Sequence, residues 1–425
     1  MPDLFACPVQ GRLEWQVFFM RGSSMAMYAY IFSNSPIILW GLSSRQRLER
    51  VLRRAGVVDF LENLESIPPQ SSVLLIRGDY LYDDRVINRL IETTNMVLQA
   101  GPDGARVAVA ANVPSGLVSQ AWELLNGGST EKSLPDIRTE IPETLSSSYQ
   151  ARLKKSDPPF VLPITETTHR ELENRLFAGS YKGVTDLITK WAWPRPAQWC
   201  TRVCVRFGLS PNQVTFIGFV LAIIATVLFA RGRFGWGLLA GWVMTFLDTV
   251  DGKLARVTIT SSRFGHLFDH VIDLVHPPVW YVAWGLGLGV SYVGSPEISL
   301  NTVLGVIIGG YIVGRLVELA FKLLGSFVIF IWRPVDSYFR LITARRNPNL
   351  ILLTTGALTG HCDLGLLAVA FWTGLTSLFL IIRLCMAGYT RIASGPLRTW
   401  MLDIDQKTYD KSLAAKLFTQ PPAKP

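Results

Sequence analysis

Cysteine and histidine are scarce in this chain of 425 residues, which contains five of each. The cysteines are scattered, and Cys200 and Cys204, although four residues apart, have no second pair of metal ligands nearby. This pattern does not match a structural zinc site or a disulfide framework, so reduced cysteines in the cytosol are the default expectation. We also find no internal repeat and no cleavable signal peptide at the N-terminus.

Charged residues are also few, at 17% of the chain, whereas hydrophobic residues make up 49% and the mean hydropathy is +0.29. These values are typical of a membrane protein, and the apolar residues are concentrated in the second half of the chain. Segments of this length and polarity predict membrane-spanning helices. We expect six, at about residues 212–230, 235–255, 264–290, 300–330, 349–361 and 364–388.

Lysine and arginine gather at one end of these predicted spans. The connections after about residue 290 and near 361–363 contain neither residue type, and the opposite ends contain many, with Arg231 and Arg233 as exceptions. The positive-inside rule then predicts a multi-pass integral membrane protein with its active site and both termini on the cytoplasmic side. The chain has a net charge of +9, and because its cations cluster at these membrane ends, we expect anionic membrane lipids as partners and no nucleic acid.

Four aspartates lie where the second and third predicted spans meet. Asp248 and Asp251 are three residues apart and Asp269 and Asp273 are four apart, so each pair shares one face of a helix. Two such faces turned toward each other repel unless cations lie between them. Carboxylate oxygens suit Mg²⁺, Mn²⁺ or Ca²⁺. The sequence therefore predicts a divalent-metal site at this membrane face.

The residues around these acids complete a longer pattern. Gly252 removes a side chain beside Asp251, so that a bulky group can approach the helix, and Arg256 supplies a fixed cation for phosphate. With Ala255 and Gly265, the order D-x2-D-G-x2-A-R-x8-G-x3-D-x3-D fills every defining position of a known signature. It resembles the signature of the CDP-alcohol phosphotransferase family, also called the CDP-alcohol phosphatidyltransferases, and the resemblance covers about residues 180–390.

The resemblance implies a transferase of phospholipid biosynthesis, which moves a substituted phosphoryl group from a CDP-linked donor such as CDP-diacylglycerol to an alcohol acceptor and releases CMP. It implies Mg²⁺ or Mn²⁺, as two ions, held by Asp248, Asp251 and Asp269. Asp273 is the implied catalytic base and a further metal ligand, and Arg256 the implied phosphate ligand. It also implies a homodimer and these nucleotide-binding residues: Asn212, Asp248, Asp251, Gly252, Arg256 and Gly265. Thr215 is a weaker candidate. For Asn212 and Thr215, simple capping of the helix N-terminus is an equal alternative.

The later predicted spans contain charged residues, which usually face a cavity or one another at such depths. In one interpretation, Arg315, Lys322 and Arg383 form a basic pocket for an acceptor with its own phosphate, such as inositol phosphate or glycerol phosphate. In the other, Glu318 pairs with Arg315 and Lys322 at helical spacing, and the group is structural. Both interpretations stay open. His266, His270 and His276 flank the aspartates, and we interpret them as supporting or structural rather than as metal ligands, with an acceptor contact still open.

The first 165 residues have mixed polarity and short apolar runs at 72–76 and 106–110, which predict strands of a cytosolic α/β domain. Residues Pro36–Val57 and Val73–Asp79 are similar to part of a sugar-phosphate nucleotidylyltransferase, in which Asp79 would hold a metal. The G-x-G-x-R phosphate loop of that family is absent before this segment. We therefore expect a degenerate, noncatalytic domain that stabilises the transferase, mediates dimerisation or senses a nucleotide.

The predicted fold class is thus multi-domain: an α/β head at 1–165, a linker with an interfacial amphipathic helix at 166–210, an all-α six-helix transmembrane domain at 211–392 and a polar tail at 393–425. The interfacial helix is predicted because the segment from Tyr181 to Thr215 mixes tryptophans with lysines and arginines.

Two other function classes were weighed. A cation-coupled membrane transporter explains the acids and the spans. It does not require Gly252, Ala255, Arg256 and Gly265 at these positions. A noncatalytic nucleotide-binding pseudoenzyme is disfavoured by the complete set of acids.

Overall fold

The computed structural model describes residues 26–101, 105–127, 137–260, 263–294, 298–402 and 404–421. The chain forms two compact units. Unit 1 comprises Met1–Asn34, Leu48–Ser146 and Phe160–Leu162, and unit 2 comprises Ser35–Arg47, Ser147–Pro159 and Pro163–Pro425. Residues 35–47, which the sequence placed in the head, thus cluster with the helical part. The predicted domain boundaries remain predictions.

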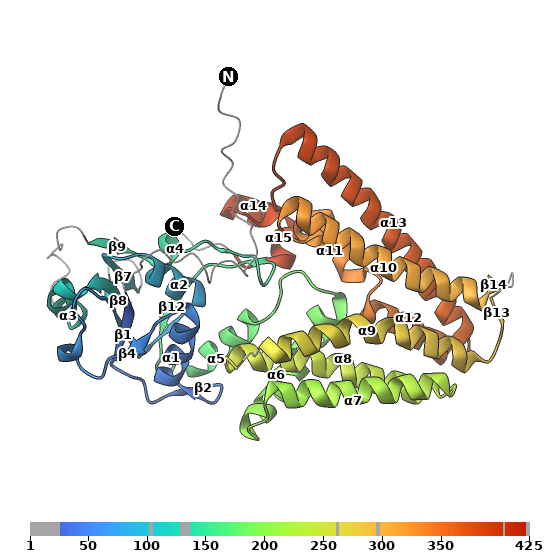
Figure 1. Ribbon diagram of the computed structural model, residues 1–425, viewed down its shortest axis with the longest axis horizontal. Helices are drawn as coiled ribbons and strands as arrows, with labels where there is room; N and C mark the ends of the chain where they lie inside the picture. Colours follow the sequence, from blue (N-terminus) through green and yellow to red (C-terminus); the bar gives the residue numbers. More distant parts are fainter. Residues whose placement is uncertain are drawn as a thin grey trace. The chain divides into compact units, whose positions relative to one another are not determined.

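Unit 1 holds a mixed sheet, which within the described residues has the strand order β4-β1-β5-β8-β7-β9 (Figure 1). β1 runs parallel to β4 and β5, β8 runs antiparallel to β5 and β7, and β7 runs parallel to β9. The strand bounds are β1 Met27–Phe32, β4 Asp59–Phe60, β5 Ser72–Arg77, β7 Met96–Ala100, β8 Val107–Pro114 and β9 Arg138–Glu140.

The two predicted strands at 72–76 and 106–110 correspond to β5 and β8. Val73 to Ile76 are completely buried, as expected of a central strand that is covered on both faces. The other elements assigned wholly or mainly to unit 1 are α1 Ser44–Ala55, η1 Leu64–Ser66, β6 Tyr80–Tyr82, α2 Asp84–Glu92, η2 Ser115–Leu117, α3 Val118–Leu125, α4 Pro142–Leu145 and β12 Val161–Pro163.

Unit 2 is mainly helical. Its helices are α5 His169–Gly179, η3 Ile188–Ala192, α6 Pro194–Arg206, α7 Pro211–Ala230, α8 Phe234–Val257, α9 Arg263–Leu288, α10 Leu300–Gly325, η4 Ile329–Ile331, α11 Pro334–Ile342, α12 Arg346–Leu358, α13 Cys362–Ser394, η5 Trp400–Leu402, α14 Gln406–Lys411 and α15 Leu413–Phe418. Short strand pairs join β2 Ile38–Leu39 to β3 Leu42–Ser43, β10 Tyr149–Gln150 to β11 Lys155–Ser156, and β13 Tyr292–Val293 to β14 Ile298–Ser299.

Each predicted membrane span falls on a helix, namely α7, α8, α9, α10, α12 or α13. Among the described residues, α7, α10 and α13 are long and apolar enough to cross a membrane. The chain therefore has the character of a membrane protein. The count of six spans and their orientation remain predictions; α12, with 13 residues, extends only about 20 Å.

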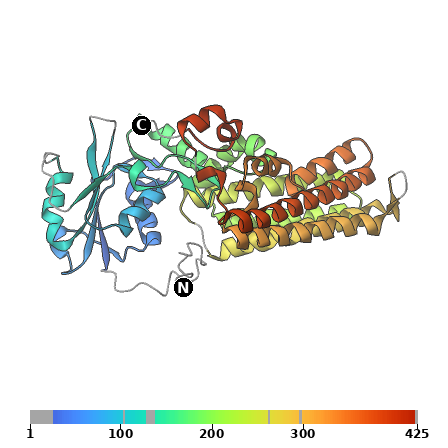
Figure 2. The ribbon, with the colours of Figure 1, turned by 90° about the horizontal axis from the view of Figure 1, so that it is seen from above.

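Helices α7, α8 and α9 pack closely around buried aromatic rings. Phe229 and Trp284 are completely buried, with ring centroids 5.1 Å apart. A Cβ atom at Gly287 would lie only 1.8 Å from the carbonyl oxygen of Phe229, so the close approach of α7 and α9 requires glycine there. Within the same unit, α9, α10 and α13 lie alongside one another (Figure 2).

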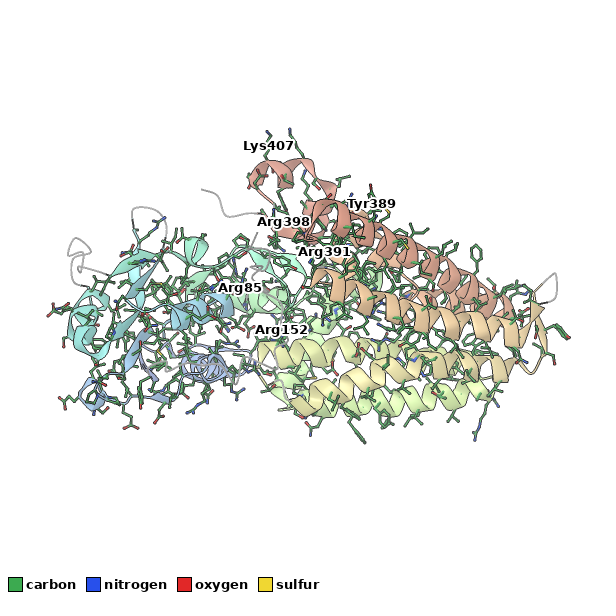
Figure 3. The ribbon with its side chains drawn as sticks, turned by 45° about the horizontal axis from the view of Figure 1, so that its top comes forward. Arg85, Arg152, Tyr389, Arg391, Arg398 and Lys407 are labelled. Carbon is green, nitrogen blue, oxygen red and sulfur yellow. The ribbon has the colours of Figure 1, made fainter. Side chains whose placement is uncertain are left out.

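The C-terminal region, predicted to be a polar tail, packs onto unit 2 instead of extending from it. Phe418 of α15 is buried, 5.4 Å from the ring of Tyr338, and belongs to one hydrophobic cluster with Phe321 and Met401. Exposed side chains lie around the end of α13 and after it: Tyr389, Arg391, Arg398 and Lys407 (Figure 3). Residues 422–425 lie outside the described residues.

Candidate active site

A cavity of about 510 Å³ lies in unit 2. Its lining comes from the segment before α6 and from helices α8 to α12. Acidic side chains from α8 and α9 lie on its wall, and so do cations from several other elements. The cavity therefore brings together residues that are distant in the sequence and opposite in charge.

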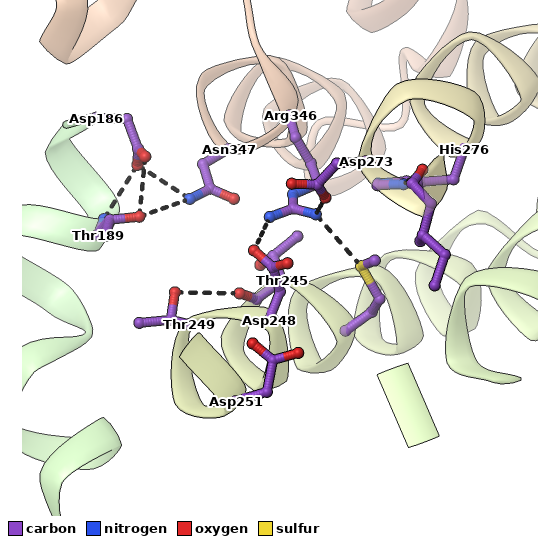
Figure 4. A network of polar contacts seen from close by, with 12 residues as sticks. Asp186, Thr189, Thr245, Asp248, Thr249, Asp251, Asp273, His276, Arg346 and Asn347 are labelled. Atoms are coloured by element: carbon purple, nitrogen blue, oxygen red, sulfur yellow. Dashed lines mark hydrogen bonds and ion pairs between the residues drawn. The ribbon is translucent and has the colours of Figure 1, made fainter. Parts of the chain in front are cut away.

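Asp248 of α8 and Asp273 of α9 are joined by Arg346, the first residue of α12 (Figure 4). Nη1 of Arg346 donates a hydrogen bond to Oδ1 of Asp273 at 2.7 Å, and Nη2 donates to Oδ2 of Asp248. The Asp273 side chain is 41% exposed. The structure thus places one acid from each predicted pair at the same point of the cavity.

Asp251 points to α7. It is 6% exposed, and its Oδ2 accepts a hydrogen bond of 2.6 Å from the hydroxyl of Thr215. Charge-assisted hydrogen bonds of this length fix the orientation of a carboxylate. Thr215, predicted as a minor nucleotide contact, therefore orients a predicted metal ligand.

The remaining motif residues differ in what the structure describes. Asp269 and Gly265 lie in α9, but the side chain of Asp269 lies outside the described residues, as do those of His266 and His270. A Cβ atom at Gly252 would lie 3.1 Å from Nη2 of Arg256, so this glycine leaves room for the Arg256 guanidinium.

Arg256 lines the cavity, as the motif predicts, whereas Asn212 is exposed in the first turn of α7. The cap of that helix is Ser210, whose hydroxyl accepts a hydrogen bond from the Gln213 backbone at 3.3 Å. The nucleotide-binding role of Asn212 stays a prediction.

Cations in the cavity lining include Arg315 of α10, Arg340 of α11 and Lys182, which precedes η3. Among the described residues, Nη1 of Arg340 has no hydrogen-bond partner, and burial, with the nearby charge of Arg345, lowers the pKa of Arg340 to about 10. Burial, together with Arg256 and Arg340, lowers the pKa of Lys182. Buried cations whose pKa values are lowered by neighbouring positive charge favour an anionic ligand.

Two residues of the predicted acceptor pocket lie elsewhere. Arg383 is buried and binds both carboxylate oxygens of Asp336, with Nη2 and Oδ2 2.8 Å apart. Lys322 is exposed on α10. Neither lines the cavity as the described residues form it. Arg315 does, and its Nη1 lies 3.7 Å from Oε2 of Glu318, one of the pairings foreseen in the structural interpretation.

The sequence patterns above did not single out the first turn of α12 as part of the site. Arg345 and Arg346 count there only among the lysines and arginines that indicate orientation. Arg345 pairs with Glu318. Asn347 donates hydrogen bonds to Oδ1 of Asp186 at 3.0 Å and to the Thr189 hydroxyl at 3.2 Å. The available signal was the run Arg-Arg-Asn-Pro-Asn at the start of a predicted span, since polar residues at such a place mark functional sites.

His276 also lines the cavity, one turn after Asp273. Its Nδ1 donates to the carbonyl of Ile272 at 2.6 Å, because a carbonyl oxygen only accepts, and its ring packs edge-on against Trp280. These contacts agree with a structural role.

The residues of the site fit a divalent cation. Asp248, Asp251 and Asp273 offer only carboxylate oxygens, which Mg²⁺ and Mn²⁺ prefer. A cationic group, the Arg346 guanidinium, already bridges two of them. Within the described part of the chain, which omits the Asp269 side chain, no three acids, histidines or cysteines are grouped closely enough to hold an ion.

Residues 209–333 match the family model of the CDP-alcohol phosphatidyltransferases. This segment runs from the start of α7 to the residue before α11 and contains the whole aspartate motif. The match confirms, for this segment, the resemblance seen in the sequence. The resemblance of the head to a nucleotidylyltransferase remains a prediction.

Two curated relatives are similar to this domain. A phosphatidylinositol phosphate synthase from Mycobacteroides abscessus is 33% identical over 90 residues, which cover 20% of this chain and 41% of that protein. An archaetidylinositol phosphate synthase from Pyrococcus horikoshii is 33% identical over 98 residues, which cover 22% of this chain and 50% of that protein. The chain thus spans half or less of the length of these relatives.

Solved structures of one protein also align with the chain. The crystal structure of Mycobacterium tuberculosis phosphatidylinositol phosphate synthase with CDP-DAG bound is 18% identical, covers 45% of this chain and 94% of that chain, and has a TM-score of 0.31. The same synthase in complex with manganese and citrate has a TM-score of 0.30. Scores at this level are too low to support a structural inference.

Proposed function

We propose that this protein is a membrane transferase that moves a substituted phosphoryl group from a CDP-linked lipid to an alcohol and releases CMP, in phospholipid biosynthesis. The observation that supports this most directly is the cavity, because Asp248, Asp273 and Arg256 of the family motif line it together with further cations. In the reaction, the acceptor oxygen forms a new bond to phosphorus, and the bond from that phosphorus to the oxygen of CMP breaks.

The donor we propose is CDP-diacylglycerol. The matched family model is that of the CDP-alcohol phosphatidyltransferases, and the two curated relatives are named for inositol phosphate lipids. Arg256 would bind phosphate oxygens of the donor, since a guanidinium fits phosphate geometry. Asn212, Gly252 and Gly265 would complete the nucleotide site.

Mg²⁺ or Mn²⁺, as two ions, would be held by Asp248, Asp251, Asp269 and Asp273. When bound, such ions offset the charge of the pyrophosphate and of the leaving CMP. Asp273, whose side chain is partly exposed to the cavity, would take the proton from the attacking hydroxyl.

The acceptor we propose carries its own phosphate, as inositol phosphate or glycerol phosphate does. The cavity lining supports this choice, because Lys182, Arg315 and Arg340 add positive charge to it beyond the family motif. These residues take the place of Lys322 and Arg383 in the pocket predicted from the sequence, and Arg315 stays in it.

The membrane arrangement we propose has six spans with the active site and both termini in the cytoplasm, as the lysine and arginine pattern predicts. Helix α6 would lie on anionic lipid, and it carries Trp199 with a 69% exposed side chain. The exposed cations Arg391, Arg398 and Lys407 follow the last predicted span, which agrees with a cytoplasmic C-terminus. A homodimer and a degenerate, noncatalytic head complete the proposal.

The test compares wild-type protein with its Asp273→Asn variant, both purified and supplied with CDP-diacylglycerol and Mg²⁺. Inositol phosphate, glycerol phosphate, free inositol, serine and ethanolamine are offered separately, and CMP release and product mass are measured. We expect turnover with a phosphorylated acceptor in the wild type and none in the variant. If folded wild-type protein releases no CMP with any acceptor, the proposed reaction is wrong, and a pseudoenzyme or a carrier becomes the better explanation.

A further inference from the structure

The proposed metal site contains an arginine at a point where an ion is expected. Arg346 contacts one oxygen of Asp248 and one oxygen of Asp273, and its side chain is only 16% exposed. Arg346 is not part of the family motif, because it lies on α12, outside the matched segment 209–333. The inference below rests on the proposed function, because it concerns how that site takes up metal.

A guanidinium and a divalent ion cannot serve the same two oxygens together. The nitrogen of Arg346 lies 2.7 Å from Asp273 Oδ1, whereas Mg²⁺ binds oxygen at about 2.0–2.1 Å. An ion shared by the two carboxylates would draw their oxygens closer than a guanidinium between them allows. The ion and the guanidinium would also repel each other strongly in a partly buried site. Binding of either cation therefore opposes binding of the other.

The backbone around Arg346 is held in place, so that its side chain is the part able to move. Arg345 pairs with Glu318, and Asn347 donates to Asp186 and Thr189. Two residues further on, Asn349 donates to the hydroxyl of Tyr281 at 2.8 Å. These contacts fix the first turn of α12 against three other parts of unit 2. Arg346 itself lines the cavity, into which a displaced guanidinium can turn.

We propose that Arg346 is an internal counter-cation which holds Asp248 and Asp273 in the metal-free protein and competes directly with the divalent metal for them. Metal binding displaces the guanidinium into the cavity, where it becomes a ligand for the phosphates of the CDP-linked donor. Metal and donor then bind with positive coupling. The metal frees the Arg346 guanidinium to bind the donor phosphates, and the bound donor keeps the guanidinium away from Asp248 and Asp273.

The experiment is a Mn²⁺ titration of purified full-length protein, in which the electron paramagnetic resonance signal of free Mn²⁺ gives the affinity. It compares wild type, Arg346→Gln and Arg345→Gln. Both variants remove one positive charge beside the cavity, but Arg345 pairs with Glu318 instead of the motif acids. We expect Arg346→Gln to bind Mn²⁺ about tenfold more tightly, within the range of about 5–150-fold usual for coupled ligands. Arg345→Gln should stay within about twofold of wild type.

A melting series in detergent gives a second readout. Without metal, Arg346→Gln should melt below wild type, because two carboxylates then lie together without their counter-cation. Mn²⁺ should raise its melting temperature more than that of wild type. A wild-type or weaker Mn²⁺ affinity in folded Arg346→Gln would overturn the proposal, and so would an equal gain in Arg345→Gln.

Failure of the inference can be told apart from failure of the proposed function. If wild type binds Mn²⁺ and releases CMP while Arg346→Gln has unchanged Mn²⁺ affinity, competition is wrong and the reaction stands. If none of the three proteins binds Mn²⁺ and none releases CMP, both are overturned. Tight Mn²⁺ binding by Arg346→Gln alone would support the competition in its strongest form.

Discussion

The hydroxyl of Thr215 donates a hydrogen bond of 2.6 Å to Oδ2 of Asp251, so a residue in the first turns of α7 orients a carboxylate of α8. We expect Thr215→Val to lower kcat/KM for CMP release by about tenfold or more, since hydrogen bonds to charged groups contribute about 1.5–3 kcal/mol. Thr215→Ser keeps the hydroxyl and should retain most of the activity. Wild-type turnover in Thr215→Val would show that Asp251 needs no such support.

Asp251 could be predicted from the sequence as a site residue, whereas its hydrogen bond with Thr215 could not. The acids, their helices and the family follow from local spacing, because residues three or four apart share a helix face. The bond from Thr215 to Asp251 joins residues 36 apart and depends on how α7 packs on α8. The same limit applies to Arg346, whose partners lie 98 and 73 residues away.

The acceptor pocket shows a second limit. Charge within a predicted span indicates a partner or a cavity, but it does not say which. Arg383 has a partner, Asp336, in the short helix α11, which lies between predicted spans. Arg340, in the same short helix, lines the cavity and had no periodic signal to single it out.

The Arg383–Asp336 pair should control stability and not acceptor binding. Both side chains are almost completely buried, so Arg383→Ala leaves an unpaired buried carboxylate and should lower the free energy of unfolding by about 3–5 kcal/mol. Removal of both charges, in Arg383→Met with Asp336→Leu, should recover much of the loss. Unfolding in detergent, monitored by tryptophan fluorescence, measures this. An acceptor KM that changes while stability does not would restore Arg383 to the acceptor pocket.

Arg340 should bind the acceptor phosphate. We expect Arg340→Gln to raise the KM for a phosphorylated acceptor about tenfold, equivalent to about 1.4 kcal/mol, and to leave the KM for CDP-diacylglycerol nearly unchanged. Lys322→Gln is the matched control, because Lys322 is an exposed cation on α10. Steady-state CMP release with each substrate varied in turn gives both constants. If the two variants raise the acceptor KM equally, the effect comes from the loss of positive charge in general and not from a contact between Arg340 and the phosphate.

Lys154 should make stability depend on pH. It lies in the turn between β10 and β11, and burial, with the charges of Lys182, Arg340 and Arg345, lowers its pKa from 10.5 to about 7. Between these two values the unfolded chain holds a proton that the folded protein has lost, so stability rises with pH from about 7 to about 10. Below about pH 7 both states are protonated and this contribution is constant.

Melting temperatures over this pH range test the assignment. Lys154→Met should flatten the rise, and it should also be more stable than wild type at the acidic end, because it removes a charge that burial disfavours. Lys407→Met, at an exposed position, should keep the wild-type slope. If Lys154→Met and wild type have parallel profiles, another group titrates.

Residues 35–47 should be required by the transferase, although they belong to the predicted head. Trp40 is 2% exposed and stacks on Phe177 with centroids 5.6 Å apart, and its indole donates to the Glu173 carbonyl at 2.9 Å. Arg47 donates through Nη2 to the carbonyl of Val257 at 2.7 Å, at the end of α8 and next to Arg256. This segment therefore holds the last turn of the helix that carries the motif.

We expect Trp40→Ala to destabilise unit 2 by about 3–5 kcal/mol, as for other buried aromatic residues, and to abolish CMP release. Arg47→Met should also lower CMP release, with a smaller loss of stability of unit 2, about 1.5–3 kcal/mol. Trp122→Ala is the control, since Trp122 packs on Phe32 within unit 1 at a centroid distance of 4.8 Å. If the head is noncatalytic, that variant should weaken unit 1 and keep CMP release. Loss of CMP release in Trp122→Ala but not in Trp40→Ala would contradict both expectations, because activity would then depend on the head and not on this segment.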